Sequence, residues 1–239
     1  HFEPDRLRSA VRTILEAGGS RPGEAEIVAD HLVLANQSGH DSHGIGMIPA
    51  YVQNLSKELL VPNETPQLVT DTGSILVFDG RRGYGQSIGR QAMELGIERC
   101  REHGVVLMTL RNTHHLGRIG TYGEQALQAG LASMHFVNVT DHQPDVAPYR
   151  GSDSRFMTNP ICLAIPGTEN QPPVVLDMAT SRIAAGKVRV AYNKAEPLPE
   201  GTVIDGRGQP TTDSDVFARD PPGSLLPFGE HKGYGLALF

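Results

Sequence analysis

The chain has 239 residues, of which 38% are hydrophobic and 20% are charged, a composition typical of a globular protein with enough apolar side chains for a core. Its net charge is −6 and its basic residues are scattered, which disfavours a nucleic-acid-binding surface, and no apolar run is long enough to cross a bilayer. The two cysteines, Cys100 and Cys162, lie far apart, which favours reduced thiols in a cytoplasmic protein over a disulfide or a thiolate metal site.

Residues 1–65 predict a small helical domain. Apolar residues recur at helical spacing from Leu7 to Leu15, and a pair of glycines ends the run. We expect Ser20 to cap a second helix, because serine is favoured at that position. A third helix is expected around Tyr51, after the stretch SGHDSHGIG.

Residues 66–230 predict an α/β domain with a mixed sheet. Asp71-Thr72-Gly73 separates two short apolar runs, which is typical of a β-hairpin. A helix from Gln86 to Glu102 is followed by the strand-like run VVLMTL, and ICLAIPG and PVVLDMA indicate further strands. The polar stretch LPEGTVIDGRGQPTTDSD is rich in turn residues, and we expect it to be a surface excursion.

Residues 231–239 begin an apolar helix that stops without a cap or a terminating glycine or proline. We therefore expect the chain to be a fragment that lacks a C-terminal segment.

The stretch FDGRRGYGQSIGRQAM follows a strand and opens a helix, as a dinucleotide-binding loop does. Gly83 and Gly85 match the first two positions of GxGxxG, but Ile88 occupies the third. No acidic residue follows at the expected distance, and no GxxxxGK[ST] loop is present. The sequence therefore argues against both a Rossmann domain and a P-loop enzyme.

Two stretches carry histidines among glycines. GHDSHGIG holds His40, Ser42 and His43 in a connection between helices, and RNTHHLGRIG places His114 and His115 directly after an apparent central strand. Ligands gather at the carboxyl ends of strands in α/β proteins. Adjacent histidines point in different directions in an extended chain, so one histidine acting as acid–base is favoured over a metal pair. A packed loop histidine without special chemistry stays open as the alternative.

Two further stretches indicate an anionic ligand. VVLDMATSRIAAGK leads from a strand into a helix with Thr180 and Ser181 near its start, where exposed N–H groups favour phosphate. GEHKGYG places His231 and Lys232 at another helix start, where a lysine can neutralise phosphate or carboxylate.

The motifs GHDSHGIG, RNTHHLG, TNPICLAIP, VVLDMATS and HKGYGLAL occur in an order and spacing that resemble the malate/L-lactate dehydrogenase family of NAD(P)-dependent oxidoreductases. This non-Rossmann family also includes sulfolactate, ureidoglycolate and diketogulonate enzymes and cyclic imino-acid reductases. The resemblance implies an α/β fold (α+β-like): a small helical domain plus a non-Rossmann α/β NAD(P)-binding domain with a mixed sheet. It also implies that residues 231–239 start a helix that returns to the helical domain, and that the protein is a homodimer.

The resemblance implies hydride transfer between nicotinamide, as NAD or NADP, and a small 2-hydroxy or 2-keto acid such as malate or lactate. His43 and His115 match the catalytic histidines, either of which could be the general acid or base, and Ser42 matches a residue beside the substrate. The cofactor contacts that the resemblance implies are Asp177, Met178, Ala179, Thr180, His231 and Lys232. It implies no metal.

One departure from the family pattern keeps alternatives open. Met47 stands where many relatives carry an arginine that could anchor the substrate carboxylate, and Arg118 is a candidate substitute. A cyclic imino-acid (piperideine- or pyrroline-2-carboxylate) reductase is therefore an alternative within the family. A metal-dependent hydrolase using His40, His43 and His115 is the alternative from another class, and a ligand-binding homologue without turnover is a third.

Overall fold

The computed structural model describes residues 2–140 and 143–239. The chain forms two compact units, the first running to Ser133 and including Ala164–Val175, the second holding Met134–Leu163 and Leu176–Phe239. Helices combined with small sheets confirm the predicted α/β class. The first unit contains both the N-terminal helices and the first sheet, so the expected separation into domains at residues 65 and 66 stays a prediction.

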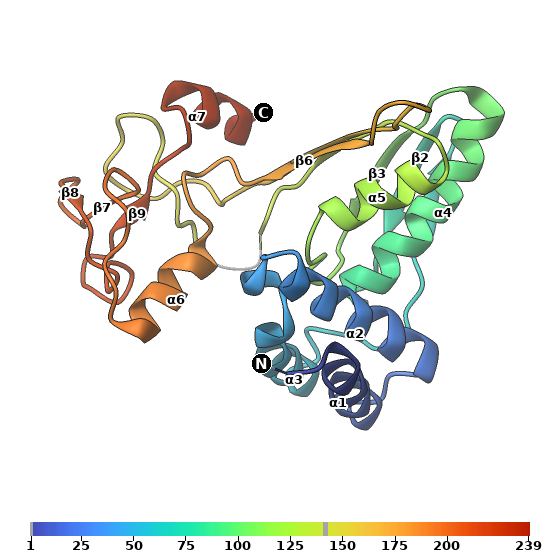
Figure 1. The fold of residues 1–239 in the computed structure, drawn as a ribbon, viewed down its shortest axis with the longest axis horizontal. Coiled ribbons are helices and arrows are strands. Elements are labelled where there is room, and N and C mark those ends of the chain that lie inside the picture. Colours follow the sequence, from blue (N-terminus) through green and yellow to red (C-terminus); the bar gives the residue numbers. More distant parts are fainter. Residues whose placement is uncertain (1, 141–142) are drawn as a thin grey trace. The chain divides into compact units, whose positions relative to one another are not determined.

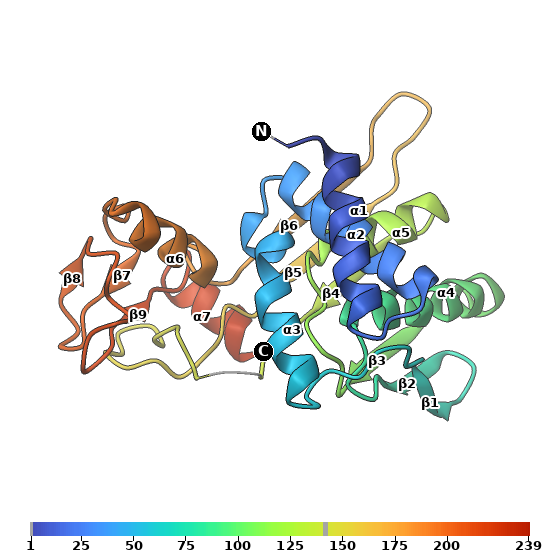
Figure 2. The ribbon, with the colours of Figure 1, turned by 90° about the horizontal axis from the view of Figure 1, so that it is seen from below.

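The N-terminal helices form as predicted and share one core. They are α1 (Pro4–Ala17), α2 (Pro22–Gln37) and α3 (Ile48–Ser56), each with a proline in its first turn, where no N–H is needed. Helices α1 and α2 pack side by side (Figure 2). The fully or nearly fully buried residues of this core are Val11, Leu15, Ala25, Val28, Ala29, Leu32, Ile48, Tyr51, Leu60 and Tyr84.

The expectation that Ser20 caps α2 was wrong. The helix begins at Pro22, so the capping position falls on Arg21, which makes no side-chain cap. Proline stabilises this start through its fixed φ, and Ser20 is buried one residue too early to reach the free N–H groups.

Asn63 fastens the segment after α3 to the turn between α1 and α2. Its φ is 63°, a left-handed conformation that asparagine tolerates better than most residues. Its backbone N–H lies 2.9 Å from both carboxylate oxygens of Glu24, and its side chain accepts from Arg21 N at 2.6 Å and donates to Gly19 O at 2.8 Å. Burial raises the pKa of Glu24, and the Ser20 and Asn63 hydrogen bonds oppose that rise.

The first sheet is mixed, as predicted. Strands β1 (Gln67–Asp71) and β2 (Ile75–Asp79) form the expected antiparallel hairpin, and β3 (Leu107–Arg111) pairs parallel with β2. Figure 1 labels β2 and β3, and Figure 2 labels all three strands. Helix α4 (Gly85–His103) connects β2 to β3, because parallel neighbours need a crossover. In the described ranges β3 is an edge strand of the sheet order β1-β2-β3, so the expectation that it is a central strand was wrong. Although the strand is mostly apolar, its residue Leu107 is 63% exposed.

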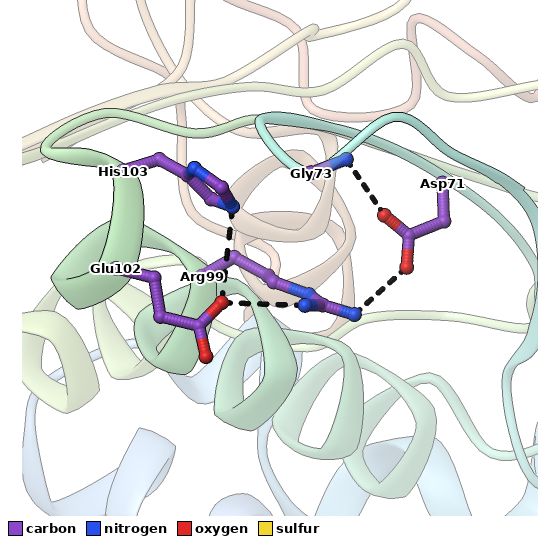
Figure 3. A network of polar contacts seen from close by, with 5 residues as sticks. All are labelled: Asp71, Gly73, Arg99, Glu102 and His103. Carbon is purple, nitrogen blue, oxygen red and sulfur yellow. Dashed lines mark hydrogen bonds and ion pairs between the residues drawn. The ribbon is translucent and has the colours of Figure 1, made fainter.

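A polar network holds the hairpin turn against the end of α4 (Figure 3). Asp71 accepts a hydrogen bond from Gly73 N at 2.9 Å and an ion pair from Arg99 at 2.8 Å. Arg99 also pairs with Glu102 at 3.3 Å, and His103 lies 3.7 Å from the same carboxylate. Gly73 has a φ of +85°, and a Cβ there would lie 3.0 Å from His103 Nε2. Glycine at the turn therefore allows both the backbone conformation and the close approach of α4.

The middle of the chain supplies one more helix and a second sheet. These elements are α5 (Gly120–Gln128), β4 (Ser133–Phe136), β5 (Ile161–Ile165) and β6 (Val174–Met178), with the strand order β4-β5-β6. In the ranges 2–140 and 143–239 no helix combines the length and the apolar character that a membrane span requires.

The second unit has its own core around a small sheet of order β8-β7-β9. Its elements are α6 (Ala185–Lys194), β7 (Val203–Ile204), β8 (Pro210–Thr211), β9 (Ser224–Leu225) and α7 (His231–Leu238). The expected surface excursion is wrong for β7, because Val203 is fully buried and packs with Leu198 and Leu225. The turn-rich stretch thus contains two apolar residues, Val203 and Ile204, that form β7 and are buried.

Two substitutions at Asn63 separate its side-chain bonds from its backbone conformation. We expect Asn63→Ala to lower the free energy of unfolding by about 2–3 kcal/mol, through lost hydrogen bonds and a strained left-handed backbone. Asn63→Gly loses the same bonds but tolerates the backbone, and should recover about 1 kcal/mol of that loss. Urea denaturation of both variants measures the difference; equal stabilities would show that the backbone conformation carries no cost.

Candidate active site

Two loops of the first unit bring the predicted catalytic residues together. Ser42 and His43 lie on a 3₁₀ turn, η1 (Asp41–His43), that follows α2, and His115 lies in the loop that follows β3. The rings of His43 and His115 stack with their centroids 5.4 Å apart and 30° between their planes. Ser42 Oγ is 2.9 Å from His43 Nδ1. All three residues that the motifs singled out for catalysis therefore form one cluster.

A tyrosine and a glutamine that sequence reasoning missed complete this cluster. The Tyr51 hydroxyl of α3 lies 2.7 Å from His115 Nδ1, and Gln86 Nε2 of α4 donates to the same hydroxyl at 2.7 Å. Tyr51 is fully buried and Gln86 is 1% exposed. Helical spacing predicts that Tyr51 is a core residue, and no local pattern points to its contact with a histidine 64 positions away.

His114 and His115 contact different residues of α3. His114 Nε2 lies 2.9 Å from Asn54 Nδ2, and the His114 ring meets the Tyr51 ring edge-on at 5.3 Å. Helix α4 starts at Gly85, where a Cβ would overlap the carbonyl oxygens of both histidines. Glycine in the stretch that resembles a nucleotide loop thus allows the first turn of α4 to pack against the loop after β3 that carries His114 and His115 (the histidine loop).

Burial keeps the imidazoles of His115 and His31 neutral. Withdrawal from water, together with the neighbouring His43, His114 and His31, lowers the pKa of His115 to about 3. Withdrawal from water also lowers the pKa of His31 to about 4, with Arg118 and His43 acting in the same direction. At neutral pH both rings are therefore uncharged.

His31 and Gly117 hold the end of the histidine loop in place. Arg118 N donates to His31 Nε2 at 2.9 Å, so the His31 proton resides on Nδ1. Gly117 has a φ of +76°, and a Cβ at that position would overlap the His31 ring. Glycine is thus required by both conformation and space.

The expected substitute for the substrate-anchoring arginine is engaged elsewhere. The two terminal nitrogens of Arg118 donate to Glu124 at 2.9 and 2.6 Å, and the arginine side chain is 10% exposed. A substrate carboxylate would have to displace this bidentate pair. Met47, at the position where the family resemblance leads us to expect an arginine, packs against the helical core.

In the second unit Thr180 supports the loop after β6. It is fully buried, and its hydroxyl donates to the carbonyls of Thr158 at 2.9 Å and Asn159 at 3.1 Å. Its own carbonyl accepts from Phe228 N at 3.0 Å. The Thr180 hydroxyl is therefore engaged in hydrogen bonds to backbone carbonyls.

The expectation that Thr180 and Ser181 begin a helix was wrong. Helix α6 starts at Ala185, and the Ser181 hydroxyl donates to Ile183 O at 2.7 Å. Both hydroxyls bind loop carbonyls, which stabilises a non-helical connection. Among the other expected cofactor contacts, Asp177 and Met178 end β6 and Ala179 follows; all three are half-buried.

His231 and Lys232 form the exposed first turn of α7. The N–H groups of Lys232, Gly233 and Tyr234 all donate to backbone carbonyls, at 3.1, 2.9 and 3.2 Å. The His231 ring meets the Tyr149 ring at 5.8 Å. The Lys232 ammonium, rather than the helix backbone, is therefore the group at this turn suited to an anion such as a phosphate.

Among residues 2–140 and 143–239, no group of three histidine, cysteine, aspartate or glutamate side chains is arranged to hold a metal ion.

A family model described as malate/L-lactate dehydrogenase matches residues 2–239. The chain belongs to this family. It is 48% identical over 236 residues to hydroxycarboxylate dehydrogenase B of Escherichia coli K12, covering 99% of this chain and 65% of that protein. The chain thus spans just under two thirds of that relative's length.

Solved structures of other family members have the same fold. The sulfolactate dehydrogenase of Methanocaldococcus jannaschii is similar with a TM-score of 0.87 and 37% identity, covering 99% of this chain and 66% of that one. The delta1-piperideine-2-carboxylate reductase of Pseudomonas syringae has a TM-score of 0.88 and 30% identity, covering 99% and 69%.

The close contact between Gly117 and the His31 ring predicts that a methyl group added at position 117 strongly lowers the free energy of unfolding. We expect Gly117→Ala to lower the free energy of unfolding by more than about 3 kcal/mol, because backbone strain and overlap with a buried ring act together. Gly130→Ala is the matched control: its φ is +75°, and no atom lies within 4 Å of the added Cβ. It should cost about 1 kcal/mol. Similar losses in urea denaturation would show that His31 does not restrain the loop.

The lowered pKa of His31 makes folding stability depend on pH. In the unfolded chain His31 binds a proton at its ordinary pKa near 6.5, and in the folded chain only near 4. The contribution of the neutral His31 to the free energy of unfolding is therefore fully present above pH 6.5 and is lost as the pH falls towards 4. This histidine alone should remove about 3 kcal/mol across that window.

His31→Gln should lower stability at pH 7 and also flatten the pH dependence, because the proton-binding group is gone. Urea denaturation at pH 4 to 8 tests this, and the free energies of unfolding of the wild type and of His31→Gln should change in parallel above pH 7. An unchanged slope between pH 6.5 and 4 in the variant would contradict the assignment.

Proposed function

We propose that the protein is an NAD(P)-dependent dehydrogenase that transfers a hydride between nicotinamide and a small 2-hydroxy or 2-keto acid. The observation that carries this proposal is the stacked pair of His43 and His115, with Ser42 on one ring and Tyr51 on the other. Membership of the malate/L-lactate dehydrogenase family supports it.

The histidine cluster suits the charge that develops during reduction of a keto acid. The bound cofactor supplies or accepts the hydride. When the carbonyl carbon gains a hydride, its oxygen becomes negative and needs a hydrogen-bond donor and a proton. His43 and His115 supply these groups, and the Ser42 hydroxyl orients the substrate.

The cofactor, NAD or NADP, would be held by Asp177 to Thr180 and by His231 and Lys232. The exposed Lys232 ammonium fits a cofactor phosphate. Thr180 contributes by holding the loop backbone in place through its hydrogen bonds to two carbonyls.

A cyclic imino-acid reductase is the second candidate. It is supported by the likeness to a piperideine-2-carboxylate reductase, and Met47 in place of the arginine that the resemblance implies suits it equally. The same histidines would then act on a C=N bond instead of C=O.

We further propose that the protein is a homodimer in the cytoplasm. The family resemblance supports the dimer, and Cys100 and Cys162, which are not joined in a disulfide, are consistent with a reducing compartment. Light scattering coupled to size exclusion measures the assembly.

The decisive experiment mixes the full-length protein with NADH or NADPH and screens 2-keto acids and cyclic imino acids for oxidation of the cofactor. We expect His43→Ala and His115→Ala each to lower kcat by about 10²–10⁴-fold while reduced-cofactor binding survives. His103→Ala removes a histidine outside the cluster and should change neither. A wild-type protein that oxidises neither cofactor with any of these acids would overturn the proposal.

A further inference from the structure

A hydrogen-bonded chain of three side chains determines which nitrogen of His115 carries its proton. Gln86 Nε2 and His115 Nδ1 each lie 2.7 Å from the Tyr51 hydroxyl. An amide nitrogen can only donate, so the Tyr51 oxygen accepts from Gln86. Tyr51 has one hydroxyl hydrogen, and His115 Nδ1, the other nitrogen at 2.7 Å from this hydroxyl, is the partner able to accept it.

An Nδ1 that accepts a hydrogen bond leaves the imidazole proton on Nε2. His115 is therefore a neutral ring with its N–H on the side away from Tyr51. A second proton on Nδ1 would face the Tyr51 hydrogen and would require the whole chain to reverse. Burial of Tyr51 and Gln86 opposes this, because no water is available to them to replace the lost bonds.

The groups around His115 act in the same direction. His31 of α2, His43 of η1 and the adjacent His114 each oppose a positive charge on His115, and Arg118 opposes one on His31.

His43 has a different kind of partner. Its Nδ1 lies 2.9 Å from Ser42 Oγ, and a hydroxyl accepts an N–H as readily as it donates. Ser42 can therefore stabilise a doubly protonated His43, whereas Tyr51 disfavours a doubly protonated His115.

We propose that Gln86 and Tyr51 are positioning residues that hold His115 as the neutral Nε2–H tautomer, so that His115 donates a hydrogen bond to the substrate oxygen and His43 transfers the proton. The division of roles rests on the proposed function; the tautomer does not. In the reducing direction the carbonyl carbon receives the hydride of the reduced nicotinamide, and the C–O π bond breaks. The oxygen takes the proton of the His43 imidazolium, leaving a hydroxy acid, oxidised nicotinamide and a neutral His43 that regains a proton from solvent. A neutral imidazole that polarises a carbonyl needs no proton of its own to give.

Long-range ¹H–¹⁵N correlation spectra of the full-length protein, labelled with ¹⁵N-histidine, test the tautomer without substrate or cofactor. We expect His115 to show a protonated Nε2 and an unprotonated, hydrogen-bonded Nδ1 from pH 8 to pH 5. A proton on Nδ1, or an imidazolium at His115 at pH 6, would overturn the proposal.

Variants of the chain identify what selects the tautomer. Tyr51→Phe removes the hydrogen given to Nδ1 but keeps the ring, and should produce a mixture of both tautomers. Tyr84→Phe is the matched control, because it removes another buried tyrosine hydroxyl of the same core, outside the hydrogen-bonded chain, and should leave His115 unchanged. Gln86→Leu frees the Tyr51 oxygen and should also populate Nδ1–H, which keeps the test valid if Tyr51→Phe does not fold. His115 signals that match wild type in both Tyr51→Phe and Gln86→Leu would refute the relay.

Conservative replacements separate the two histidine roles. Glutamine can donate a hydrogen bond but cannot transfer a proton, so His115→Gln should keep kcat within about tenfold of wild type while His115→Ala loses about 10²-fold. His43→Gln should be no better than His43→Ala. The opposite pattern would overturn the assignment of roles. If the wild-type protein shows no turnover, the proposed function fails, and the tautomer result still stands or falls on its own spectra.

Discussion

The hydrogen bond between Tyr51 and His115 is the contact on which the site depends. It joins α3 to the loop after β3, two segments 64 positions apart, at a donor–acceptor distance of 2.7 Å. Because Tyr51 is also a member of the helical core, the position of the histidine is tied to the packing of α1, α2 and α3. A side chain held by a buried core keeps its geometry better than one held only by its own loop.

The site combines close approach of the backbone with an apolar environment. Glycine at positions 85 and 117 removes the side-chain atoms that would otherwise separate α4 and α2 from the histidine loop. The resulting burial lowers the pKa of both His31 and His115, because a charged imidazole loses its hydration there. The same packing that orders the loop thus also determines its protonation.

Several features could be predicted from the sequence because their causes are local. Period and turn residues predicted the three N-terminal helices and the β1–β2 hairpin, and the family motifs selected His43 and His115. Local rules failed where a contact distant in sequence decided the outcome. The Thr180 hydroxyl binds the carbonyls of Thr158 and Asn159 instead of starting a helix, and Val203 in the turn-rich stretch is buried in a core with Leu198 and Leu225.

The sequence by itself determined the residue types available for proton transfer, the elements that carry them and the family to which their motifs belong. Only the tertiary structure decided which groups touch each other: that Arg118 is paired with Glu124, and that Tyr51 and Gln86 face His115. Helix and hairpin formation depend on neighbours a few positions apart, whereas a tautomer depends on a hydrogen-bond partner that only the packing of distant segments supplies.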